Sequence, residues 1–211
     1  MSTISIIGAG EMAAAIARLA IGAGHAVELA SRDTAKARRL AEQLGARAST
    51  GVFGAAPAGD LVILAVPYAS AQDVLAEYGD ALSGRVLVDI TNPIKADFSG
   101  FLTAGDTFGA AEIARAARSA TTVVKAFNTQ FSHVLAAGAL AGTTLDVFVA
   151  GDDVAAKTRV ASFIGSLGLR AWDVGPLRVA QTLEHVCMLT LGLMTHAIKH
   201  TQFAIGVTVA G

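Results

Sequence analysis

The chain has 211 residues, of which 53% are hydrophobic and 16% are charged, and its formal net charge is −1. The hydrophobic content is sufficient for one large domain, and the balanced charge argues against the basic surface with which proteins bind nucleic acids. The lone cysteine, Cys187, cannot form an internal disulfide, and the opening residues lack the positively charged flank of a secretory signal. We therefore expect a cytoplasmic protein with no nucleic-acid partner.

Strand and helix patterns alternate along the chain. From the N-terminus they predict strand 3–8, helix 11–24, strand 25–31, helix 33–45, a weak strand at 46–50, strand 60–67, helix 70–79 and strand 85–90. An irregular segment (94–109) follows, and then helix 110–118, strand 121–127, a strand within 145–153, helix 153–168 and strand 169–175. An apolar helix at 183–200 and the tail 203–211 end the pattern.

Most of these strands are unbroken runs of Val, Ile, Leu and Ala, without alternating polar residues. Such runs are typical of parallel strands that helices cover on both faces. The sequence therefore predicts an α/β fold with a doubly wound, Rossmann-type parallel sheet. We expect residues 1–175 to form this domain and residues 176–211 to form a small C-terminal helical extension packed on it.

The segment IIGAGEMAAA follows the first strand and contains the pattern Gly8-x-Gly10-x-x-Ala13. In a dinucleotide-binding turn the first glycine permits the tight turn and the second lets the backbone approach a pyrophosphate. The phosphates then lie over free backbone N–H groups at the helix N-terminus, which Glu11 and Met12 would provide. A glycine turn without a ligand is the alternative, but the strand–turn–helix context favours dinucleotide binding.

The end of the second strand indicates which dinucleotide binds. Roughly twenty residues after the glycine loop, this strand end meets the adenosine ribose, where an acidic residue would repel a 2′-phosphate. This chain has Ser31 and Arg32 there, with Lys36 one helical turn later, and all three donate to phosphate oxygens. We therefore expect NADP and an NADP-binding domain over 1–175. Two alternatives stay open: Arg32 as a solvated surface residue, and Glu28 as a ribose-binding acid.

Eight stretches carry a resemblance to a known family. They are GAGEMA, ASRD, ILAVPYAS, AAEIA, VVKAFNT, AGDD, DVGPLRVAQTLE and FAIGVTV, and together they extend over essentially the whole chain. None is diagnostic alone, but in this order and spacing they resemble the NADP oxidoreductases that depend on the deazaflavin coenzyme F420. The NADPH-binding domain of membrane metalloreductases and, more distantly, imine and hydroxyacid reductases share much of this pattern.

The resemblance implies that NADPH lies extended on the domain, with its nicotinamide facing a second redox ring, a deazaflavin or a flavin. It assigns the pyrophosphate to Gly8, Ala9, Gly10, Glu11 and Met12, the 2′-phosphate to Ser31, Arg32 and Lys36, the track between adenosine and nicotinamide to Val66 and Pro67, and the nicotinamide to Ala126, Asn128 and Thr129. Better-known members have Thr at the position of Ala9 and His at that of Asn128, which leaves the identity of the second ring open.

Hydride transfer between two ring cofactors needs little acid–base catalysis, so we assign no catalytic residue. An imine or carbonyl substrate would require a proton donor. Asn128, Thr129, Tyr68 and His133 are the nearby candidates, and none stands out.

The C-terminal segment 183–200 carries Glu184, His185, His196 and Lys199, and it is too short and too polar to span a membrane. We expect an apolar helix that packs on the core or in a homodimer. His196 and His200 are spaced i, i+4 on one helix face, but without a third ligand we expect no metal site. His25 is expected to be structural, and Cys187 to be a small buried hydrophobic residue.

Three functions compete. The first is an NADP-dependent oxidoreductase that passes hydride between NADPH and coenzyme F420 or a flavin. The second is an NADPH-dependent reductase of a small imine or carbonyl substrate, whose relatives usually add a long helical domain. The third is a non-catalytic NADP-binding sensor. We favour the first because the resemblance extends over the whole chain.

Overall fold

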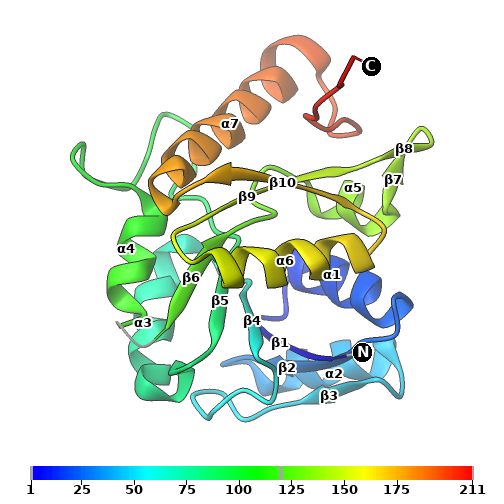
Figure 1. Ribbon diagram of the computed structural model, residues 1–211, viewed down its shortest axis with the longest axis vertical. Coiled ribbons are helices and arrows are strands. Elements are labelled where there is room, and N and C mark those ends of the chain that lie inside the picture. Colours follow the sequence, from blue (N-terminus) through cyan, green and yellow to red (C-terminus); the bar gives the residue numbers. More distant parts are fainter. Residues whose placement is uncertain (1, 119–120, 211) are drawn as a thin grey trace.

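The computed structural model of the protein describes residues 2–118 and 121–210, and its centre is an eight-stranded sheet (Figure 1). The strands lie side by side in the order β10-β9-β6-β5-β4-β1-β2-β3. Their bounds are β1 (Thr3–Ile7), β2 (Ala26–Ala30), β3 (Ala48–Thr50), β4 (Leu61–Leu64), β5 (Val86–Asp89), β6 (Thr122–Lys125), β9 (Asp146–Gly151) and β10 (Arg170–Gly175). Met1 and Gly211, the outer limits of the two predicted parts, lie outside the described residues.

Helices cover both faces of this sheet. One face packs against α1 (Glu11–Gly22), α2 (Thr34–Leu44), α5 (Ser132–Ala137) and α6 (Val154–Ser166). The other face packs against α3 (Tyr68–Tyr78) and α4 (Gly109–Ala116). In Figure 1, α3 and α4 lie to the left of the central strands and α6 lies to the right.

Burial on both faces explains the unbroken apolar runs of the sequence. Leu61 and Ile63 of β4 belong to the core shared with α1 and α6, while Val62 and Leu64 belong to the core shared with α3 and α4. All four side chains are at most 7% exposed. A strand buried in this way has no solvent-facing side and needs no polar alternation. The predicted doubly wound Rossmann-type fold is confirmed.

Two features were not predicted. The strand β9 pairs antiparallel with β6, so β9 and β10 run against the remaining strands. Because burial on both faces is the same in either orientation, an apolar run cannot reveal it. The helix α5 and a small hairpin, β7 (Ala139–Leu140) with β8 (Thr143–Thr144), occupy the segment after β6. These elements are too short to show a readable period.

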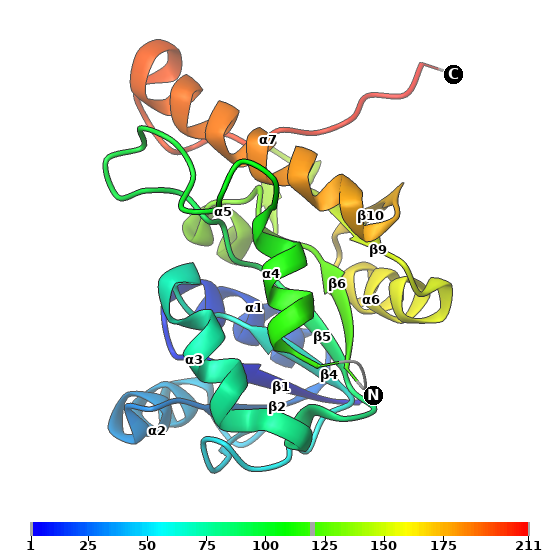
Figure 2. The ribbon, with the colours of Figure 1, turned by 90° about the vertical axis from the view of Figure 1, so that its left-hand side faces the viewer.

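The C-terminal extension is helical, as expected. The helix α7 (Ala180–Gly192) continues as a π-helical segment, Leu193–Ile198, and a tail follows. Figures 1 and 2 place α7 at the top of the molecule, above α4 and β9. Buried Ala180 and Leu183 pack there against Ala110 and Ala150. Within the described ranges, every helix falls short of the length and hydrophobicity that crossing a bilayer requires.

Candidate functional site

The turn between β1 and α1 combines one crowded glycine with one open glycine. Gly8 has φ = +124°, and a Cβ added to it would lie 2.1 Å from the carbonyl oxygen of Ala65. Only glycine fits this position. A Cβ added to Gly10, the N-cap residue of α1, would meet no atom within 4 Å among the described residues. The backbone approach in front of the helix is therefore open.

The first turn of α1 is suited to an anion. Its N–H groups have no partners within the helix, and Gly10 provides no side-chain cap. The carboxylate of Glu11 accepts a hydrogen bond from Ser132 Oγ of α5 (3.1 Å), so a partner on the protein holds this negative charge. The backbone N–H groups of Glu11 and Met12, at a positive helix end, match the chemistry of a phosphate group.

A pocket of about 170 Å³ lies beside this turn, at the carboxyl ends of β1, β2 and β4. Its lining residues are Gly8, Ser31, Arg32, Phe53, Val66, Pro67, Ser70 and Val74. The guanidinium of Arg32 lies 5.7 Å from the centre of the Phe53 ring, within cation–π range. The structure thus brings together Gly8, Ser31, Arg32, Val66 and Pro67 from three separate loops.

Three lining residues of this pocket were not found from the sequence. Phe53 lies in the loop after β3, where no pattern marks it. Ser70 and Val74 lie on α3 with i, i+4 spacing, so they share a helix face. That spacing was the available signal for the two α3 residues.

Two charged residues near the pocket differ in their contacts: the Lys36 side chain is exposed, and the Glu28 carboxylate is hydrogen-bonded within the protein. Lys36 is exposed in the first turn of α2, where its backbone N–H donates to the Asp33 N-cap, and it is not among the described residues that line the pocket. Glu28 accepts hydrogen bonds from Ser5 Oγ (2.6 Å) and from the backbone N–H of Ala58 (2.9 Å). The Glu28 carboxylate is thus hydrogen-bonded to β1 and to the loop before β4.

The segment after β6 holds three more of the predicted residues, and all are buried. Ala126 is fully buried, and Asn128 and Thr129 are each 4% exposed. Phe127 between them adopts φ = +61°, a left-handed conformation that a buried aromatic residue rarely takes. The Nδ2 group of Asn128 donates to Asn92 Oδ1 (2.9 Å) and to the carbonyl of Leu183 (3.0 Å). Its Oδ1 has no partner among the described residues.

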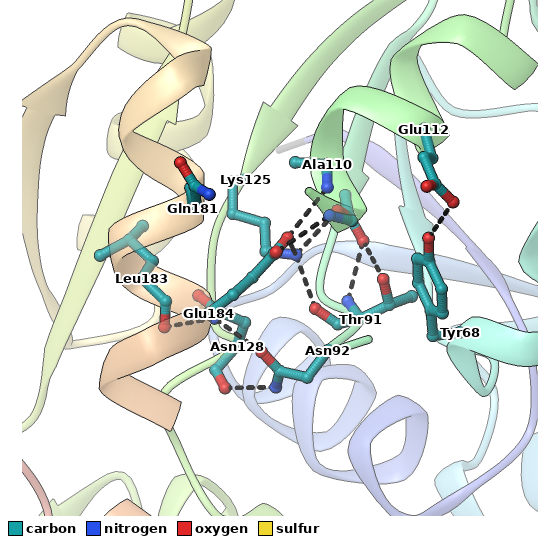
Figure 3. Close-up of polar contacts among 12 residues, drawn as sticks. Tyr68, Thr91, Asn92, Ala110, Glu112, Lys125, Asn128, Gln181, Leu183 and Glu184 are labelled. Atoms are coloured by element: carbon teal, nitrogen blue, oxygen red, sulfur yellow. Dashed lines mark hydrogen bonds and ion pairs between the residues drawn. The ribbon is translucent and has the colours of Figure 1, made fainter. Parts of the chain in front are cut away.

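A buried ion cluster lies beside this segment and was missed from the sequence (Figure 3). Lys125 Nζ donates to Asp89 Oδ2 (2.9 Å), Glu184 Oε1 (3.1 Å) and the carbonyl of Thr91 (2.6 Å). The three charged side chains are at most 2% exposed. Asp89 also accepts from the N–H and hydroxyl of Thr91, so the cluster is well satisfied. A lysine at the end of an apolar strand was the only signal, and its partners lie far away in sequence.

Of the proton-donor candidates, Tyr68 shows little acidic character. The hydroxyl of Tyr68 donates a hydrogen bond to Glu112. Burial, this hydrogen bond and the negative charges of Glu112, Glu184 and Asp89 all raise the pKa of Tyr68 above its usual value. Tyr68 therefore holds its proton tightly at neutral pH. His133 contacts the carbonyl of Thr201 in the C-terminal tail (3.0 Å).

Cys187 of α7 is half-buried, and His25 is held between two serines. Burial raises the pKa of Cys187 to about 11, which disfavours the reactive thiolate. His25 bridges Ser2 and Ser166 through its two ring nitrogens.

The shared helix face predicted for His196 and His200 is wrong. Lys199 adopts φ = +61° and ends the helix before His200. In residues 2–118 and 121–210, no three His, Cys, Asp or Glu side chains gather in a way that could hold a metal.

Comparison with known proteins agrees with this geometry. The family model described as "NADP oxidoreductase coenzyme F420-dependent" matches residues 3–93. The F420-dependent NADP reductase of Methanothermobacter marburgensis is 30% identical over 194 residues, which are 83% of this chain and 84% of the relative. The chain belongs to this family. Membership confirms the resemblance found in the sequence and the class of NADP-dependent oxidoreductase.

Two further similarities describe how this F420-dependent NADP oxidoreductase family member relates to other proteins. A crystal structure from Arthrobacter sp. FB24, provisionally named an F420-dependent NADP reductase, has a TM-score of 0.87 and 25% identity, and the match covers 99% of this chain and 100% of that one. Metalloreductase STEAP3 of Rattus norvegicus is 28% identical over 183 residues. This match covers 87% of the family member described here but only 36% of the metalloreductase.

Proposed function

We propose that this family member transfers hydride between NADPH and a ring acceptor, coenzyme F420 or a flavin. The observation that carries the proposal is the pocket in which Gly8, Ser31 and Arg32 meet at the carboxyl edge of the sheet. Ligands of doubly wound folds bind at this edge. A hydroxyl and a guanidinium beside a free helix N-terminus match the two phosphate sites of NADP.

Each part of NADP is assigned to residues along this carboxyl edge of the sheet. The N–H groups of Glu11 and Met12, beside Ala9 and Gly10, would hold the pyrophosphate, and Ser31 and Arg32 would hold the 2′-phosphate, with Lys36 within one helical turn. Val66 and Pro67 would line the path towards the nicotinamide, and Ala126, Asn128 and Thr129 would surround that ring. Among the described residues, no atom lies within 4 Å of a Cβ added to Gly10 and none partners the Oδ1 of Asn128; these two observations support the two ends of this path.

When bound, NADPH supplies a hydride to the acceptor ring. The chain contributes orientation and the exclusion of water, which are the main requirements for transfer between two rings. Asn128 Oδ1 is a buried acceptor without a partner in the described part of the chain, and an N–H group such as the carboxamide of the nicotinamide would supply one. The hydrogen bonds to Asn92 and Leu183 hold its amide in one orientation.

The experiment that tests the proposal mixes the purified protein with NADPH and oxidised coenzyme F420 and follows the visible absorbance of the deazaflavin. NADH and FMN are run in parallel. Rapid bleaching with NADPH, and slow or no bleaching with NADH, is the expected result. Protein that binds NADPH but reduces neither F420 nor FMN would contradict the proposed acceptor class.

A cytoplasmic homodimer is part of the same proposal. Leu189 of α7 is 56% exposed, and the apolar side chains of Leu191, Leu193 and Met194 are only half-buried. A second copy packed on this helix would cover them. Light scattering on the eluting protein should give twice the mass of one chain, and a monomer at micromolar concentration would contradict the dimer.

A further inference from the structure

The ion cluster behind Asn128 carries an excess of negative charge. It contains one cation, Lys125, and two anions, Asp89 and Glu184, and therefore has a formal net charge of −1. All three side chains are removed from water, so solvent does little to screen this charge. Hydride transfer requires no proton exchange with this cluster. The function proposed above therefore gives its negative charge no role.

Hydrogen bonds and adjacent backbone residues connect the charge to the segment proposed to contact the nicotinamide (Figure 3). Asn128 donates to the carbonyl of Leu183, the residue that precedes Glu184 (3.0 Å). Asn128 Nδ2 donates to Asn92 Oδ1, and Asn92 Nδ2 donates to the backbone carbonyl of Asn128. Asn92 follows Thr91, whose carbonyl accepts a hydrogen bond from Lys125 Nζ. Asn128 therefore contacts the residue that directly precedes Glu184 on α7.

The two redox forms of the cofactor differ in charge at this place. Loss of a hydride, which is one proton with two electrons, converts the neutral dihydronicotinamide of NADPH into the cationic ring of NADP⁺, and the acceptor ring is reduced by that hydride. A fixed negative charge nearby favours the cation. We propose that Glu184 and Asp89 stabilise bound NADP⁺ relative to bound NADPH and so make bound NADPH the stronger hydride donor. This inference rests on the proposed function, and it adds the direction of transfer.

Neighbouring charges support a negative potential at the site. The backbone N–H groups of Gly109 and Ala110, at the positive N-terminus of α4, donate to Glu184 and offset part of its charge. Glu112 adds another carboxylate, which accepts hydrogen bonds from Tyr68 and Gln72. Burial is the main reason for the raised pKa of Tyr68, followed by Glu112, and the negative charges of Glu184 and Asp89 raise it further.

The test compares the Kd values of NADP⁺ and NADPH by calorimetric titration of the wild-type protein and Glu184→Gln. At roughly 10 Å and an effective dielectric constant of about 20, one unit charge changes the ratio of the two Kd values roughly tenfold. Wild-type protein should bind NADP⁺ at least as tightly as NADPH. In Glu184→Gln, the Kd of NADP⁺ should rise roughly tenfold more than that of NADPH.

Three controls separate charge from folding. Adenosine 2′,5′-bisphosphate, which lacks the nicotinamide, should bind Glu184→Gln as it binds the wild type. The same loss of charge on the exposed surface of α2, Glu42→Gln, should leave the ratio unchanged. Asp89→Asn removes the other carboxylate charge and should shift the ratio in the same direction, which covers the case that Glu184→Gln does not fold.

The outcomes distinguish this inference from the proposed function. Equal weakening of both redox forms, or an unchanged ratio in a variant that still binds the bisphosphate, overturns the role of the charge. Wild-type protein that binds NADPH far more tightly than NADP⁺ overturns it without any variant. Wild-type protein that binds neither dinucleotide refutes the proposed function.

Discussion

Arg32 is the residue on which the choice between NADP and NAD depends in this site. It lines the pocket beside Gly8, and its guanidinium lies over the Phe53 ring, which limits its freedom before any ligand arrives. Arg32→Glu should weaken NADPH binding roughly tenfold to a hundredfold, the value of one charge-assisted hydrogen bond, and leave NADH binding nearly unchanged. Fluorescence titration of the two reduced dinucleotides measures both effects.

A matched control for this prediction is Arg38→Glu, the same charge reversal on the exposed surface of α2. It should change the NADPH affinity by less than about threefold, because solvent and salt screen an exposed charge. Equal losses of NADPH and NADH binding in Arg32→Glu would show that Arg32 does not contact the 2′-phosphate.

At the scale of elements, the turn from β1 into α1 separates a folding requirement from a binding requirement. Gly8→Ala should destabilise the protein by about 2–4 kcal/mol, because its φ of +124° disfavours a side chain and the Cβ would collide with Ala65. Gly10→Ala should cost about 1 kcal/mol or less, because its φ of −87° suits alanine and the space around it is open. Thermal unfolding of both variants measures this contrast.

Binding should show the opposite contrast at Gly10. The methyl group of Gly10→Ala would occupy the place where a pyrophosphate approaches the backbone, so this folded variant should lose at least tenfold in NADPH affinity. Calorimetry on the purified variant tests this. Normal NADPH binding by Gly10→Ala would mean that the phosphates do not lie in front of α1.

At the scale of the whole molecule, Asp146 of β9 connects the start of β10 to the C-terminal tail. This buried residue at the start of β9 accepts hydrogen bonds from Arg170 Nε (2.5 Å) and Nη2 (2.9 Å) and from the N–H of Val207 in the tail (2.6 Å). Burial by itself would raise the pKa of Asp146, but the hydrogen bonds from Arg170 and Val207 and the charge of Arg170 outweigh it and hold the pKa below its usual value. The ionised form is therefore favoured in the folded state.

The sign of the pH effect follows from this lowered pKa. The carboxylate stabilises the fold above the unfolded-state pKa of about 3.9, and the contribution is lost as the pH falls through the lower folded-state value. Asp146→Asn should reduce the free energy of unfolding by roughly 1–3 kcal/mol at pH 7, and the difference should shrink below about pH 4. Urea unfolding at several pH values, with exposed Asp106→Asn as the control, measures it. Equal stability of Asp146→Asn and wild type at pH 7 would contradict a stabilising role of the Asp146 contacts with Arg170 and Val207.

Local patterns carried most of the fold and part of the site. The position of the glycine turn, the order of the strands along the chain and the arginine at the end of β2 are all set by neighbouring residues, so they could be predicted. The orientation of β9, the short helix α5 and the end of the last helix at Lys199 could not. Each depends on packing or on a single backbone angle that leaves no periodic trace in the sequence.

The sequence by itself determined the class of this protein: a Rossmann-type chain with a dinucleotide turn and the motifs of the F420-dependent NADP oxidoreductase family. Only the tertiary structure revealed that Phe53 contacts Arg32 and that Lys125 pairs with both Asp89 and Glu184 across three elements. The physical reason is that turns and strand periods arise from adjacent residues. A buried charge, by contrast, acquires its meaning from partners that folding brings together from distant parts of the chain.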